Sequence, residues 1–139
     1  MDARVLLALA FALVWSVTNT FGTWATQLTY TYGQVFGTVV EDCDGSTGTT
    51  TDRTPIAGVT VAIKQGATTV ATTTTNALGQ YSFGYLDGAT YDVVVTPPAG
   101  GTNVDATAGT GATSNTRISA SDVQMALTSA QQSPGNNFV

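Results

Sequence analysis

The sequence contains no histidine and only one cysteine, Cys43. A single cysteine cannot form a disulfide within the chain, and zinc and haem sites lack their usual ligands. Nucleophilic catalysis by a Ser–His or Cys–His pair is excluded for the same reason. Carboxylates remain, but Glu41, Asp42 and Asp44 cluster on one stretch, whereas glycoside hydrolysis needs a pair facing across a cleft. We therefore predict that the chain is not an enzyme.

Charge is also scarce. Charged residues make up 9% of the chain, against about 25% in typical globular domains. Its four cations, Arg4, Arg53, Lys64 and Arg117, are spread along the sequence and leave a net charge of −5. Nucleic-acid binding needs clustered cations, so a nucleic acid is not an expected partner. The polar surface must consist of Thr, Ser, Asn, Gln and Gly, which is typical of extracellular β-proteins and predicts a cell-surface location.

The N-terminal part is apolar, and no charged residue lies between Val5 and Val40. The sequence from Val5 to Trp15 reads VLLALAFALVW, and the stretch from Ser16 to Leu28 is more polar, SVTNTFGTWATQL. Because Ala and Leu favour helices and no proline interrupts the run, we predict a helix over about residues 3–28, within a segment 1–30. Three roles stay open for it, namely a filament core, a membrane anchor and a signal peptide.

A filament core is the favoured role, because a helix that is apolar on most of its circumference must be buried on most of it. Small residues let identical helices approach closely, and Thr and Asn side chains can bond between them. Lipid would favour a segment that is apolar throughout. The predicted assembly interface consists of Asp2, Arg4, Val5, Leu6, Leu7, Ala8, Leu9, Phe11, Ala12, Leu13, Trp15, Phe21 and Trp24.

The stretch VTNTFGTWATQL, from Val17 to Leu28, resembles the helix end of small tight-adherence pilins of the type IV pilin superfamily. The resemblance implies a membrane-inserted precursor, inner-membrane assembly machinery, and a helical filament of identical subunits. The chain departs from that family at Val5, where such pilins usually carry Glu. Asp2 is the hypothetical replacement, paired with an amine or with Arg4 of a neighbouring subunit, because a charge inside an apolar bundle needs a partner.

After Gly33 the pattern changes to that of strands. β-branched and aromatic residues alternate with polar ones, and turn residues separate the runs. The predicted strands are Gln34–Asp42, Gly58–Gly66, Thr68–Asn76, Gln80–Leu86, Thr90–Pro97, Arg117–Leu127 and Asn136–Val139. Ala99–Thr116 lacks periodicity and predicts a long loop. Seven or so strands at hairpin spacing predict a mainly β protein, with an antiparallel Greek-key (Ig-like) β-sandwich over residues 34–139.

The segments PIAGVTVAI and TTTTNALGQYSFGYLDGATYDVVVTPPAG resemble the Cna-B/SdrD-B type surface modules, which are related to carboxypeptidase regulatory-like domains. The match runs from Gly37 to Gly100, and the last residues, to Val139, fit the closing strand. Tyr81, Phe83 and Tyr91 are expected in the core. Some members form a Lys–Asn cross-link from the first strand, but this chain has no lysine there.

The same resemblance implies a calcium site, because other members bind calcium through an acidic loop after the first strand. The corresponding loop runs from Glu41 to Thr54, and its candidate ligands are Glu41, Asp42, Asp44 and Asp52. Carboxylate oxygens are the ligands that calcium prefers. An acidic loop that is merely solvated is the alternative. No other cofactor is expected.

Together these observations predict a structural subunit of an extracellular, type IV-like pilus. The helix would form the core and the β-domain the outer surface, for adhesion or surface attachment. The alternative is a membrane-anchored monomeric adhesin or carbohydrate-binding module.

Overall fold

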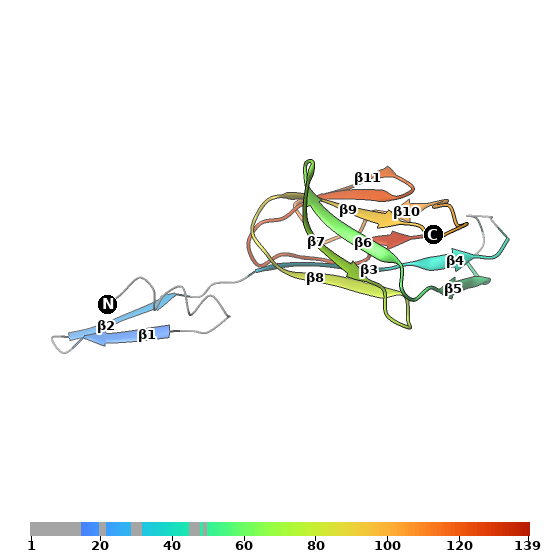
Figure 1. Cartoon of the computed structure of the whole chain (residues 1–139). Helices are drawn as coiled ribbons and strands as arrows, with labels where there is room; N and C mark the ends of the chain where they lie inside the picture. Colours follow the sequence, from blue (N-terminus) through green and yellow to red (C-terminus); the bar gives the residue numbers. More distant parts are fainter. Residues whose placement is uncertain (1–14, 20–21, 29–31, 45–47, 49) are drawn as a thin grey trace. The chain divides into compact units, whose positions relative to one another are not determined.

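A computed structural model describes residues 15–19, 22–28, 32–44, 48 and 50–139. The chain divides into two compact units, Met1–Thr31 and Tyr32–Val139. Every element in the described residues is a strand (Figure 1). Within this part of the chain, no helix of a length and hydrophobicity suited to crossing a membrane is found.

The helix predicted over residues 3–28 is wrong for the part of that range that the structure describes, residues 15–19 and 22–28. In the first unit, β1 (Trp15–Asn19) and β2 (Gly22–Leu28) pair as an antiparallel hairpin, with Trp15 opposite Leu28. The physical reason is composition, because Val, Thr and Trp dominate residues 15–28 and favour strands, while the helix-forming Ala and Leu lie mostly before Trp15. The predicted interface residues from Asp2 to Leu13, and Phe21, lie outside the described residues. Trp15 and Trp24 lie in the hairpin strands.

The second unit is an Ig-like β-sandwich, as predicted, but it is not purely antiparallel, because β13 pairs with β3 in parallel. One sheet has the order β11-β12-β9-β6-β7, and the other has the order β13-β3-β8. The first comprises β11 (Ser114–Ser119), β12 (Asp122–Ala126), β9 (Thr90–Thr96), β6 (Thr60–Gln65) and β7 (Thr68–Thr74). The second comprises β13 (Gln132–Ser133), β3 (Gly33–Thr38) and β8 (Gln80–Leu86). In Figure 1, β9 and β11 lie above β3 and β8.

Two short pairs complete the unit. β4 (Val40–Asp42) pairs with β5 (Arg53–Pro55), and β10 (Ala106–Thr107) pairs with β14 (Asn137–Phe138). The predicted loop 99–116 therefore contains β10 and the start of β11. The predicted single strand Arg117–Leu127 instead contains the end of β11, a turn between Ser119 and Asp122, and the whole of β12, which pairs with β11 as a hairpin.

The core lies between the two sheets. Side chains at alternate positions of β6, β8, β9 and β12 are buried, as the period of two in a strand requires. The buried cluster includes the predicted Tyr81, Phe83 and Tyr91 together with Phe138 from the closing strand. The ring of Tyr81 lies 6.1 Å from that of Phe83 and 6.4 Å from that of Phe138. Val39, directly before β4, belongs to this core, and Ile56, directly after β5, packs against it, so the core holds the base of the β4–β5 ladder.

Candidate metal centre

The acidic loop begins and ends on a two-strand ladder. Asp42 ends β4, Arg53 begins β5, and the two residues are register partners. Side chains alternate along a strand, so Asp42 and its neighbour Glu41 point to opposite sides. Asp42 has a side chain that is only 1% exposed, whereas Glu41 is exposed to solvent. The ladder thus turns one carboxylate inward and the other outward.

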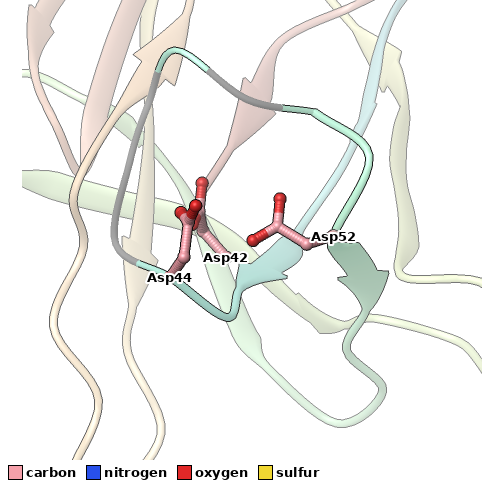
Figure 2. A group of neighbouring side chains, drawn as sticks. All are labelled: Asp42, Asp44 and Asp52. Carbon is pink, nitrogen blue, oxygen red and sulfur yellow. The ribbon is translucent and has the colours of Figure 1, made fainter.

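Three of the four predicted ligands come together. One carboxylate oxygen from each of Asp42, Asp44 and Asp52 lies within 4.8 Å of the other two. Figure 2 shows the three side chains gathered inside the loop, with Asp52 approaching from the β5 side. Glu41 does not belong to this group. We call Asp42, Asp44 and Asp52 the aspartate cluster.

The cluster contains buried oxygen atoms without hydrogen bonds. Neither oxygen of Asp42 accepts a hydrogen bond from another described residue, and Oδ1 of Asp52 is likewise buried and accepts none from this part of the chain. A buried carboxylate without hydrogen bonds is costly, and neighbouring carboxylates repel one another. Arg53 supplies one nearby positive charge, with its Nε 3.5 Å from Oδ2 of Asp42. One guanidinium against three carboxylates leaves an excess of negative charge at the cluster.

This donor set fits a calcium ion. Calcium takes oxygen ligands at about 2.3–2.6 Å, so two ligands on opposite sides of one ion are about 4.8 Å apart. The oxygens of the aspartate cluster already lie within that separation. The carboxylates of Asp42, Asp44 and Asp52 would hold the ion, and other oxygen donors would have to complete its shell.

Sequence reasoning missed Arg53, the cation closest to the cluster. The available signal was its place beside Asp52, in the run Asp52-Arg53-Thr54 that precedes a proline. Only the pairing of β4 with β5 sets Arg53 opposite Asp42. Cys43 lies between two residues of the cluster but is exposed and is not a member of it.

Comparisons with known proteins identify the family to which this fold is similar. A family model described as the SdrD B-like domain matches residues 33–138. A comparison with curated proteins finds none that matches the chain. Among solved structures, the chain is similar to the crystal structure of GBS52, the minor pilin in the gram-positive pathogen Streptococcus agalactiae. The identity is 12%, the TM-score is 0.43, and the match covers 84% of this chain and 49% of that chain.

This chain therefore spans about half the length of that protein. The family match starts at residue 33, beyond the segment that resembles type IV pilins. The comparisons give that second resemblance no support.

Proposed function

The chain belongs to the SdrD B-like domain family, and from this premise we propose that it is a non-catalytic structural module of a protein displayed on the cell surface, stiffened by calcium. The observation that carries the proposal is the aspartate cluster, in which the side chain of Asp42 is buried and neither of its oxygens accepts a hydrogen bond within the described part of the chain. Extracellular modules typically bind calcium with dissociation constants of about 10⁻⁴–10⁻³ M. Bound calcium would join the residues that flank the β4–β5 loop and offset the repulsion among their charges.

A stability measurement tests the calcium site. We expect millimolar calcium to raise the melting temperature of the whole chain by several degrees, because a ligand at ten times its dissociation constant stabilises by about 1.4 kcal/mol. Asp44→Asn should abolish the shift. Glu41→Gln is the matched control, since it removes a carboxylate from the same loop but from outside the cluster. The Glu41 variant should keep the full shift.

The opposite result has a clear meaning. If calcium changes neither the melting temperature nor the heat of titration, Arg53 alone balances the cluster and the loop is a solvated acidic loop. If Glu41→Gln and Asp44→Asn weaken the response equally, calcium acts through general screening of charge. Either outcome removes calcium from the proposal.

The non-catalytic role is supported by chemistry that the sequence lacks. The chain has no histidine. Its one thiol, Cys43, is exposed on the loop and therefore has no histidine to act as its base. Activation of a nucleophile usually needs such a base. Incubation of the purified chain with a panel of ester, peptide and glycoside substrates should release no product above the buffer rate.

Polymerisation into a filament of identical copies is the finer part of this proposal. A core of apolar helices cannot include residues 15–19 and 22–28, because these residues form a hairpin. The membrane-inserted precursor and the inner-membrane machinery depended on that helix and are not proposed. Electron microscopy of material sheared from cells, labelled with antibody against the chain, decides between decorated filaments and a monomeric surface adhesin.

A further inference from the structure

The three-stranded sheet has an outer face that turns away from the core and carries no charge. Val35 and Phe83 point inward, so their neighbours along each strand point outward. Phe36 lies opposite Ser82, and Thr38 lies opposite Gln80. We call the outward-pointing side chains of β3 and β8 the outer face. Its members are Gln34, Phe36, Thr38, Gln80, Ser82 and Tyr85.

A bulge in β8 brings Tyr85 to this face. Val35 pairs with Phe83 and Gly33 pairs with Leu86, so Gly84 and Tyr85 both lie opposite Gln34. Strict alternation after Tyr81 and Phe83 would bury Tyr85 and expose Leu86. Instead Leu86 is buried and Tyr85 is 72% exposed, with a positive φ of 59°. Bulges commonly redirect a side chain at a functional site, and a bulky residue in the left-handed region is costly.

The exposed ring is held in place by another aromatic residue. Tyr32 meets Tyr85 edge to face, with 5.4 Å between the ring centroids. Edge-to-face pairs of this kind are favourable beyond the area that they bury. An aromatic ring at the surface, fixed by a neighbour and a strained backbone, is a rigid platform and not a random exposed side chain.

Towards its other end, the outer face borders a groove. The groove has a volume of about 470 Å³ and is lined by Phe36, Thr38, Gln80 and Ser82 from the face and by Thr73 and Thr74 from β7, among others. This volume lies in the range of small-molecule sites, about 300–1,000 Å³. In the described part of the chain, the hydroxyls of Thr73, Thr74 and Ser82 make no hydrogen bond with other residues. They are available to a ligand.

We propose that the outer face and its groove bind a neutral oligosaccharide. A sugar ring offers a face of C–H groups that packs on aromatic rings and a rim of hydroxyls that exchanges hydrogen bonds with amides and hydroxyls. Phe36 and Tyr85 supply the rings, and Gln80, Ser82 and the β7 threonines supply the polar partners. Among the described residues that line the groove there is no cation to recognise a phosphate or sulfate group, so an acidic glycan is not expected.

A glycan array probed with the whole chain is the first experiment, followed by calorimetric titration of the best neutral oligosaccharide. Tyr85→Ala should weaken binding about tenfold, as expected for loss of an aromatic anchor. Alanine bears the same φ penalty as tyrosine, so the backbone strain stays comparable. Ile118→Ala is the control, because Ile118 is also a large exposed side chain, 54% exposed, but lies on β11 in the other sheet.

Half-buried Phe36 needs a second variant. Phe36→Ala can reduce stability as well as binding, so Phe36→Tyr, which keeps the ring, should retain affinity within about threefold. The proposal is overturned if the array gives no hit, if only acidic glycans bind, or if the chain captures extended peptides instead. It is also overturned if Ile118→Ala weakens binding as much as Tyr85→Ala. Because the outer face excludes the aspartate cluster, binding that survives Asp44→Asn separates this proposal from the calcium proposal.

Discussion

Asp122 is the first residue of β12, and the surroundings of its carboxyl group in the fold change its pKa. Its Oδ1 is buried and accepts no hydrogen bond. Burial raises the pKa of this carboxyl, the negative charge of Asp92 raises it further, and Lys64 opposes the change. The two aspartates share a face of the five-stranded sheet, where Gln124 donates a hydrogen bond of 2.9 Å to Asp92. The ionised form of Asp122 is therefore disfavoured in the folded state.

This pKa shift predicts a pH-dependent effect of Asp122→Asn. A carboxyl whose pKa is raised on folding binds its proton more tightly in the folded state, so it lowers stability as the pH rises above the ordinary value of 3.8. The amide removes that penalty. At pH 7 the variant should gain less than about 1 kcal/mol, since the group is partly solvated, and the gain should vanish below about pH 3.5. Urea unfolding at both pH values measures it.

Asp105→Asn is the matched control for the Asp122 variant. Asp105→Asn removes a carboxylate that is paired with Arg117 at 3.1 Å at the surface, and it should give no such gain at pH 7. An equal gain in both variants would indicate that reduced net charge, and not the surroundings of Asp122, raises stability.

Residue by residue, the candidate site could be predicted only in part. Acidic composition identified the loop, and Asp42, Asp44 and Asp52 do lie together. Alternation along the predicted strand Gln34–Asp42 could already have separated Glu41 from Asp42, because neighbouring side chains of a strand point to opposite sides. Gly84, inside the predicted strand Gln80–Leu86, was a sequence signal for the bulge that exposes Tyr85, but only the register between β3 and β8 shows which side chain it turns outward.

At the scale of elements, β3 and the segment before β14 approach each other very closely at Gly37. A Cβ on Gly37 would meet the backbone of Asn136 and the hydroxyl of Tyr81. That hydroxyl donates a hydrogen bond to the carbonyl oxygen of Asn136 at 2.5 Å. The buried amide of Asn136 in turn donates to Ser133 at 2.8 Å and accepts from the backbone of Gly109 at 2.9 Å. A glycine is thus required where the closing segment seals the sandwich.

Gly37→Ala should therefore destabilise the sandwich strongly, by more than about 3 kcal/mol, because backbone atoms must move and buried hydrogen bonds are lost. Gly84→Ala is the matched control on the partner strand, since a Cβ there meets nothing within 4 Å. It should change stability by less than about 1 kcal/mol. Denaturant unfolding followed by tyrosine and tryptophan fluorescence compares the two. Equal stability of both variants would mean that the closing segment is free to shift.

The wrong helix and the correct sandwich have one physical explanation. Strand alternation is a local pattern, and residues 58–96 show it with turn residues at the expected spacing, so most of these strands could be placed from sequence. The helix was inferred from Ala and Leu before Trp15 and then extended over β-branched residues. The short strands β5 and β10 were missed because distant contacts, and not local propensity, form them, although their partners β4 and β14 lie within predicted strands.

At the scale of the whole molecule, the division into two units predicts that the sandwich folds without residues 1–31. Burial is described from Tyr32 on, and the core residues within that part of the chain lie between Val35 and Phe138. The family match covers the same span, residues 33–138, which is large enough for an independent core. Residues 32–139 alone should therefore unfold in a single transition, with a melting temperature within about 3 °C of the whole chain.

Scanning calorimetry of both chains, with and without calcium, makes this test informative about function. The shorter chain retains the aspartate cluster and the outer face, so its response to calcium should equal that of the whole chain. A lower melting temperature, or a transition lost on removal of residues 1–31, would mean that the first unit contributes to the sandwich core. In that case the hairpin β1–β2 is an integral part of the module, and the first unit serves to stabilise the sandwich and not, in the first place, to assemble a filament.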